Sequence, residues 1–180
     1  MTSTEPDGKL IETEDGVGVR FERRLTHPIE RVWRAITEAR ELAAWFPDTI
    51  EGEFAPGAQV RFPKFTEMGL PDIGTVTEFD PPRLLEFTWG PSSLRFELEP
   101  DGDGCRLVLT DMLPREETAK NAAGWEVCLG DLEAWLAGGK PDEVDPDRWT
   151  ELHEHYATAF GVDPEVGRQA MREYGKAEAS

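Results

Sequence analysis

Apolar and polar residues alternate with a period of two through the middle of the chain, a pattern typical of strands that bury one face. The strands that it predicts are a first one through Val17, Val19 and Phe21, and then 49–54, 59–62, 73–79, 84–89, 93–98 and 104–111. Pro81 and Pro82 cannot donate to a sheet ladder, so one strand must end at Asp80 and the next must begin near Leu84. The short turns between successive strands predict an antiparallel meander with one dry face.

Two helices are expected between the first strand and this meander. Pro28 suits the first position of a helix, and the apolar residues after it recur at helical spacing. These residues are Ile29, Val32, Trp33 and Ile36. A second, shorter helix is expected from Ala39 to Trp45, because Pro47 disfavours its continuation.

A longer helix is predicted over residues 119–137, directly before the stop signal Gly138-Gly139. The residues that recur on its apolar face are Ala122, Trp125, Leu129, Leu132 and Leu136. Because the dry face of the sheet needs a cover, we expect this helix to lie across it. The predicted fold class is therefore α+β, with a curved antiparallel sheet of about seven strands packed on one long helix.

The composition becomes strongly acidic from Pro141 onward, where we predict a helical extension. Asp145 and Pro146 are residue types favoured at a helix N-cap and first turn. The residues that then share one face are Trp149, Leu152, Tyr156 and Phe160, and a weaker helix is expected over 164–174. We predict a domain at 10–139 and an extension at 140–180. Its aromatic face should dock on the chain's own domain, with a partner or dimer surface as the alternative.

The chain carries 37 acidic against 19 basic side chains, a formal charge of −18, and its basic residues do not cluster. This charge argues against nucleic acid or an anionic membrane surface as a partner. No stretch has the length of a signal peptide core or a membrane span, so we expect a cytoplasmic protein that does not insert into membranes. Cys105 and Cys128 lack metal-ligand spacing and are expected to be buried free thiols.

Few residues suggest catalysis, and we predict neither a metal nor a cofactor. His27 is expected at an exposed helix start, whereas His153 and His155 are expected on a solvated helix face, where they cannot share a metal. Glu86 should face solvent. Asp111 has the same parity as the inward residues of its strand and is a weak candidate for an acid or base, although a turn or helix-cap role is favoured.

Several residues together resemble those of a known superfamily. They are Pro28, Val32, Trp33, Trp45, Pro56-Gly57, Gly74, Val76, Pro81 to Leu84, Trp89, Gly124-Trp125, Leu129 and Leu132. This set, spread over 19–137, resembles the SRPBCC superfamily of START-like, Bet v-type helix-grip proteins. Within it, the chain is similar to the branch named after the activator of the heat-shock protein 90 ATPase. The glycine pair usual after the third-strand turn is reduced here to Gly57-Ala58.

The resemblance implies a helix-grip fold, and either binding of hydrophobic small molecules or regulation of a chaperone. It implies no fixed catalytic residue. We therefore predict that a small hydrophobic molecule binds between sheet and long helix, beneath a flap formed by residues 63–72. The alternatives are a protein-binding regulator of a chaperone or other ATPase and, third, an enzyme of the cyclase or dehydratase kind.

The predicted ligand-binding residues are mainly aromatic side chains from the inward face of the sheet and from the long helix. They are Arg61, Phe62, Phe65, Phe87, Trp89, Phe96, Leu109, Trp125, Leu129 and Leu132. Arg61 is the expected polar anchor, with Arg23 as another basic residue able to orient a carboxylate or carbonyl. A filled core without a pocket explains the same aromatic residues equally well, and the resemblance favours the pocket.

Overall fold

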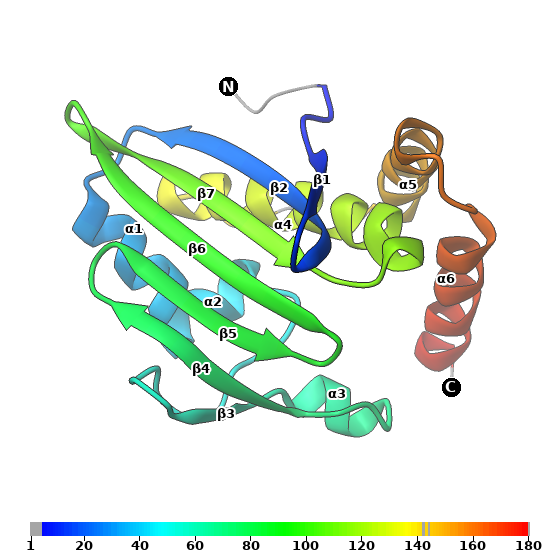
Figure 1. The fold of residues 1–180 in the computed structure, drawn as a ribbon, viewed down its shortest axis with the longest axis horizontal. Coiled ribbons are helices and arrows are strands. Elements are labelled where there is room, and N and C mark those ends of the chain that lie inside the picture. Colours follow the sequence, from blue (N-terminus) through cyan, green and yellow to red (C-terminus); the bar gives the residue numbers. More distant parts are fainter. Residues whose placement is uncertain (1–4, 142, 144, 180) are drawn as a thin grey trace.

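A computed structural model describes residues 5–141, 143 and 145–179. Within this part of the chain, seven antiparallel strands form one sheet in the order β1-β2-β7-β6-β5-β4-β3 (Figure 1). The strands are β1 (Lys9–Thr13), β2 (Gly16–Leu25), β3 (Gln59–Arg61), β4 (Ile73–Asp80), β5 (Leu84–Trp89), β6 (Ser92–Asp101) and β7 (Gly104–Met112). The helices are α1 (Ile29–Thr37), α2 (Ala39–Trp45), α3 (Pro63–Glu67), η1 (Arg115–Glu117), α4 (Thr118–Leu136), α5 (Pro146–Phe160) and α6 (Glu165–Glu178). The predicted α+β class is confirmed.

The turn between β4 and β5 lies where the prolines predict it. β4 ends at Asp80, β5 begins at Leu84, and the amide of Arg83 donates to the carbonyl of Asp80 at 2.8 Å. From this turn the sheet continues by hairpins through β6 to β7, and β7 pairs with β2. The meander is thus closed onto the first predicted strand.

One face of the sheet is dry, and α4 covers it. In β6, Leu94, Phe96 and Leu98 are buried and alternate with more exposed residues. Trp125 of α4 packs on this layer, with its ring centroid 6.5 Å from that of Phe96. Trp45 at the end of α2 also contacts Phe96, at 6.3 Å, so the short helices complete the same core. The expected position of the long helix is confirmed.

Three local expectations differ from the structure. β1 was not among the predicted strands, because its residues show no clean alternation and it pairs on one side only, with β2. Residues 49–54 make only a bridge between Glu51 and Arg61, since Gly52 adopts φ +107° and interrupts the extended run. The expected loop at 63–72 contains helix α3, with Pro63 in its first turn.

The extension docks on the domain, as predicted. Asp145 caps α5 by accepting a hydrogen bond from the amide of Asp147 at 3.0 Å, and α5 ends at Gly161 with φ +65°. Leu152, Tyr156 and Phe160 are buried. α5 lies beside α4 on the side away from the meander (Figure 1). The aromatic face of the extension is therefore part of the protein's own core.

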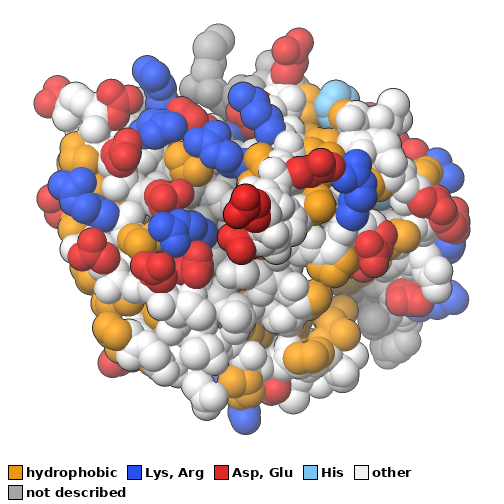
Figure 2. Space-filling view, in the orientation of Figure 1, with side chains coloured by type: hydrophobic (Ala, Val, Ile, Leu, Met, Phe, Trp, Pro, Cys, Tyr) orange, Lys and Arg blue, Asp and Glu red, His pale blue; other side chains and the backbone are white. Residues whose placement is uncertain are grey.

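Charged side chains of both signs gather over part of the opposite face of the sheet (Figure 2). Arg95 of β6 lies 3.0 Å from Glu86 of β5, which confirms that Glu86 faces outward. Arg106 of β7 lies 2.7 Å from Glu22 of β2. Such cross-strand pairs keep the outer face polar, so the interior lies on the α4 side only.

Candidate functional site

Five aromatic side chains meet where β5 ends and β6 begins, beneath α4. We call them the aromatic group: Phe46, Phe62, Phe65, Trp89 and Trp125. Ring centroids of Trp89 lie 5.3 Å from Phe46, 6.0 Å from Phe62, 5.1 Å from Phe65 and 5.9 Å from Trp125. Trp89 is thus the centre of the group. Large apolar rings with a few polar atoms among them are typical of small-molecule sites.

Helix α3 closes the group from outside. Pro63 begins the helix, and the amide of Lys64 donates to Asp48 Oδ1 at 3.2 Å. This anchor places the ring of Phe65 parallel to Trp89, with an interplanar angle of 8°. The segment then leaves Met68 63% and Leu70 44% exposed. A short helix with few buried residues of its own is the kind of element that can open locally.

Three buried polar atoms in the described part of the chain lack a hydrogen-bond partner. They are Asp48 Oδ2, Trp89 Nε1 and Asp111 Oδ1. All three belong to this region: Asp48 anchors α3, Trp89 is central, and Asp111 accepts a bond from Trp125. A buried polar group without a partner costs about 1–3 kcal/mol, so its retention in a native fold calls for an explanation.

Asp111 is buried on the inward face at the end of β7. Its Oδ2 accepts hydrogen bonds from Trp125 Nε1 at 2.8 Å and from Asn121 Nδ2 at 3.1 Å. Burial raises the pKa of Asp111 from 3.8 to about 6, although these two bonds, together with nearby Ser92 and Lys120, favour the charged form. The structure thus places the Asp111 side chain inward, as its parity in the strand predicts. The turn or helix-cap role that was favoured for Asp111 is not found.

Substituting Asp111→Asn should change how stability depends on pH. Between pH 4 and 6 the folded state holds a proton on Asp111 that the unfolded chain releases, so stability falls as pH rises through this range. The loss amounts to about 3 kcal/mol above pH 6, at 1.36 kcal/mol per pKa unit. The variant should lack this loss, so its stability relative to the wild type should increase by up to that amount from pH 4 to 7.

Urea unfolding at several pH values across this range measures the effect. Asp103→Asn is the matched control, because it makes the same chemical change in the exposed turn between β6 and β7. Parallel pH curves for Asp111→Asn and the wild type would contradict the raised pKa.

Most predicted ligand-binding residues lie together. Phe62, Phe65, Trp89 and Trp125 belong to the aromatic group, and Phe87 stacks on Phe62 with centroids 6.1 Å apart. The remaining apolar ones are buried in the same core: Phe96, Leu109, Leu129 and Leu132. These residues pack directly against one another, so the interior is largely filled by its own side chains.

Arg61 does not join them. Its side chain is 55% exposed and lies 3.5 Å from Asp72, because β3 alternates and turns Val60 inward instead. Arg23 also serves another purpose: it is held by Asp7 and Glu126 away from the aromatic group. The unpartnered polar atoms of this region belong instead to Asp48, Trp89 and Asp111.

Sequence reasoning missed three residues of this region. Phe46 and Asp48 flank Pro47 after α2, and that proline was interpreted only as a helix stop. Asn121 lies four residues before Trp125, so both side chains project from the same face of α4 toward Asp111. That spacing is the signal that could have identified the polar end of the site.

The histidines need one correction. His155 is exposed as expected, but His153 is buried, with its ring stacked on Trp149 at 5.0 Å. A Cβ atom at Gly167 would lie 2.1 Å from His153 Nε2, so α6 approaches closely there and covers the ring. Among the described residues, no cluster of His, Cys, Asp or Glu has the arrangement of a metal site.

Two of the hollows in the described part of the chain lie elsewhere on the molecule. One, of about 390 Å³, is lined by Asp7, Lys9, Arg20, Glu22 and Arg24. The other, of about 290 Å³, lies between the end of β2 and the end of α4, and its lining includes His27 and Leu136. Neither contains a residue of the aromatic group. No described helix is long and apolar enough to cross a membrane.

Comparison with known proteins agrees with this architecture. The family model described as "Activator of Hsp90 ATPase homolog 1-like protein" matches residues 26–137. The chain belongs to this family. The predicted resemblance is thereby confirmed, and the match includes α1 to α4 but neither β1 nor the C-terminal helices. A search among curated proteins gives no match.

Solved structures share the fold over most of the chain. A conserved protein of unknown function, EF2215 from Enterococcus faecalis, has a TM-score of 0.70 and 24% identity, covering 86% of this chain and 91% of its own. The protein encoded by BPP1335 from Bordetella parapertussis has a TM-score of 0.63 and 29% identity, covering 87% and 92%. DynU16, a protein in the dynemicin biosynthetic locus, has a TM-score of 0.57 and 27% identity, covering 70% and 49%.

Proposed function

We propose that the protein binds a small, largely apolar molecule at the aromatic group, beneath helix α3. The observation that carries this proposal is that buried polar atoms without a hydrogen-bond partner lie in this region. Asp111 Oδ1 can accept and Trp89 Nε1 can donate a hydrogen bond, and both lie among aromatic rings. A flat ligand carrying a hydroxyl and a carbonyl would satisfy both atoms and stack on the rings.

Access requires movement of α3, because the side chains of the closed structure fill the interior. Phe65 covers Trp89, and its helix is attached mainly through Lys64, whose Nζ donates to the carbonyl of Pro47 at 3.0 Å and whose amide donates to Asp48. The flap predicted at 63–72 would be this segment, moving away from Trp89. The similarity to a protein of a biosynthetic locus favours a small molecule as the ligand.

The proposal predicts specific behaviour toward a probe, 2-naphthol, which combines a flat apolar ring with one hydroxyl. It should quench tryptophan fluorescence saturably and bind more tightly than naphthalene, which lacks the hydroxyl. Trp89→Phe keeps the ring stack but removes the donor, and should weaken binding of 2-naphthol about tenfold, the loss of one hydrogen bond of about 1.4 kcal/mol.

Trp33→Phe is the control, because Trp33 packs on Phe79 outside the aromatic group. Equal affinity of both variants for 2-naphthol would contradict the proposed site. Native mass spectrometry of the protein purified from its own host complements this test, since a co-purified small molecule would identify the natural ligand class.

A second candidate function, acid–base catalysis on the same bound molecule, is favoured by Asp111 alone. A buried carboxyl whose pKa is raised to about 6 can exchange a proton near neutral pH. The same Asp111→Asn variant tests it, because any activity that uses this proton should disappear even at ligand concentrations that saturate the variant. Regulation of a protein partner has less support, since the aromatic face of α5 is buried.

A further inference from the structure

The outer face of the sheet carries an unusual pairing of like charges near the N-terminal strand. In the β1–β2 register Lys9 lies opposite Arg20, and in the β2–β7 register Arg24 lies opposite Arg106. Like charges directly opposite one another on a sheet face destabilise the pairing. A chain with a net charge of −18 has many acidic residues, yet four cations gather here.

The two acids that line the hollow of about 390 Å³, Asp7 and Glu22, each pair with an arginine outside that lining. Glu22 lies among the cations and accepts two bonds from Arg106, at 2.7 and 3.0 Å. These bonds, with a contribution from Arg20, lower the pKa of Glu22 to about 2. Asp7 is bound through both carboxylate oxygens to Arg23, at 2.6 and 2.7 Å. Neither acid is therefore left to balance Lys9 or Arg24.

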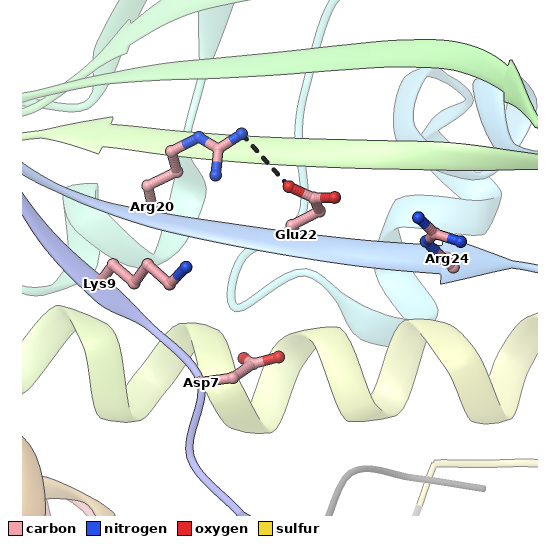
Figure 3. A pocket seen from close by; sticks show the side chains of 5 residues that line it. All are labelled: Asp7, Lys9, Arg20, Glu22 and Arg24. Carbon is pink, nitrogen blue, oxygen red and sulfur yellow. Dashed lines mark hydrogen bonds and ion pairs between the residues drawn. The ribbon is translucent and has the colours of Figure 1, made fainter.

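The remaining donors surround the hollow of about 390 Å³ described above (Figure 3). Arg20 makes a single long contact with Glu22 at 3.4 Å, and Arg24 approaches Asp101 only at 4.0 Å with its side chain 79% exposed. Lys9 lies on the edge strand near Arg20, and Arg24 lies further along β2 (Figure 3). Two guanidinium groups and an ammonium thus border a space large enough for more than one phosphate ion.

We propose that this hollow binds a phosphate group, either as free phosphate or as a phosphomonoester. Guanidinium groups bind phosphate through paired hydrogen bonds, and a doubly charged anion would relieve the like-charge pairing of Lys9 with Arg20. A singly charged carboxylate would offset the repulsion between Lys9 and Arg20 less completely. The site lies on the face of the sheet opposite to the aromatic group, so it is independent of the function proposed there.

The test uses the full-length protein titrated with inorganic phosphate and, separately, with methyl phosphate, followed by NMR signals of the β1 and β2 amides. Ionic strength is held constant with sodium chloride, because general screening also shifts exposed charges. If the proposal is right, the amide chemical shifts of residues that border the hollow should change and then saturate as phosphate is added. Lys9→Gln or Arg20→Gln should weaken binding at least about fivefold, whereas Arg83→Gln, a change at the exposed β4–β5 turn, should leave it unchanged.

Glu22→Gln provides the sharper readout, because it removes the carboxylate that lies nearest Arg20 in the lining of the hollow and should tighten phosphate binding about threefold. A misfolded variant would bind phosphate less tightly, so misfolding could not explain an increase in affinity. A tighter complex with methyl phosphate than with phosphate would identify an ester ligand, and equal binding would identify the phosphate group alone; both support the site. Linear, non-saturating shifts, equal shifts with chloride alone, or unchanged affinity in Lys9→Gln would overturn it.

Discussion

Ending the chain at Lys140, and so removing α5 and α6, should leave the protein mostly unfolded or aggregated. α5 buries Leu152, Tyr156 and Phe160, and each side chain of this size stabilises a fold by about 1.5–3 kcal/mol when buried. Together the three supply about 4.5–9 kcal/mol, comparable with the roughly 5–15 kcal/mol of total stability typical of small proteins. The truncation would also expose the matching apolar face of α4.

A chain that ends at Asp163 is the matched control, because it keeps α5 and removes only α6. Tyr174 of α6 is 54% exposed, so this shorter deletion should lower the free energy of unfolding by less than about 2 kcal/mol. Urea unfolding and size-exclusion chromatography measure both chains. If the chain ending at Lys140 were as stable as the full length, the docked face would be dispensable. A pull-down with and without residues 141–180 would then test it as a partner surface.

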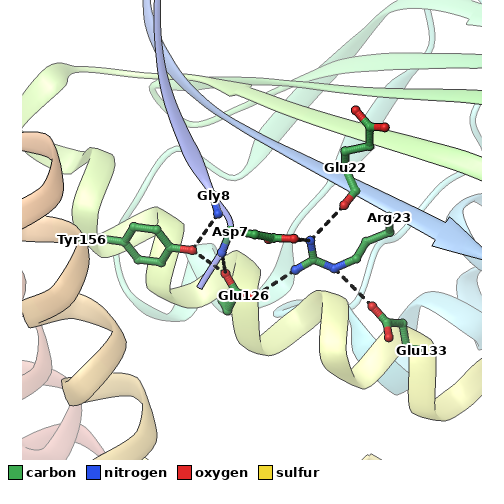
Figure 4. Close-up of polar contacts among 7 residues, drawn as sticks. All are labelled: Asp7, Gly8, Glu22, Arg23, Glu126, Glu133 and Tyr156. Carbon is green, nitrogen blue, oxygen red and sulfur yellow. Dashed lines mark hydrogen bonds and ion pairs between the residues drawn. The ribbon is translucent and has the colours of Figure 1, made fainter. Parts of the chain in front are cut away.

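Replacing Arg23 with methionine should lower the free energy of unfolding by about 3 kcal/mol. Arg23 is buried at the centre of an ion network that joins the N-terminal segment, β2 and α4 (Figure 4). It lies 2.6 Å from Asp7, 2.9 Å from Glu126 and 3.1 Å from Glu133. Tyr156 of α5 donates to Glu126 as well, so the network also holds the extension.

The size of this effect follows from where the acids lie. Breaking a buried pair by removing one partner typically costs about 3–5 kcal/mol, because the other charge stays buried. Glu126 is 7% exposed and would be left in that state, whereas Asp7, at 42%, can be hydrated. The loss in the free energy of unfolding should therefore lie at the lower end of this range, at about 3 kcal/mol.

Arg24→Met serves as the control, since that neighbouring side chain is exposed and should change stability by less than about 0.5 kcal/mol. Combining Arg23→Met with Glu126→Leu should recover part of the loss in urea unfolding, because the uncompensated charge is removed. Equal stability of Arg23→Met and the wild type would show that the network contributes nothing to the fold.

The sequence predicted best those features that depend on local chemistry. Pro81 and Pro82 placed the β4–β5 turn, Asp145 predicted the N-cap of α5, and the spacing of Leu129 and Leu132 placed α4 on the sheet. Each of these signals acts over a few residues. The family match over 26–137 agrees with the architecture that they imply.

Features that depend on long-range contacts could not be predicted in the same way. Arg23 was predicted as a basic residue that could orient a ligand, because its partners Glu126 and Glu133 lie about a hundred positions away along the chain. His153 looked solvated until α6 was placed over it. Asp111 was predicted to look inward from its strand, but its partner Asn121 was missed, since the two side chains meet only when α4 closes over β7.

The stacking of Phe65 on Trp89 limits how tightly the protein can bind any molecule at this site. Lifting α3 breaks one ring stack, of about 1 kcal/mol, and the two bonds of Lys64, of about 1 kcal/mol each. An equilibrium of about 3 kcal/mol populates the open form on the order of 1%. Because only open molecules can accept a guest, the measured dissociation constant would be about a hundred times weaker than the intrinsic one.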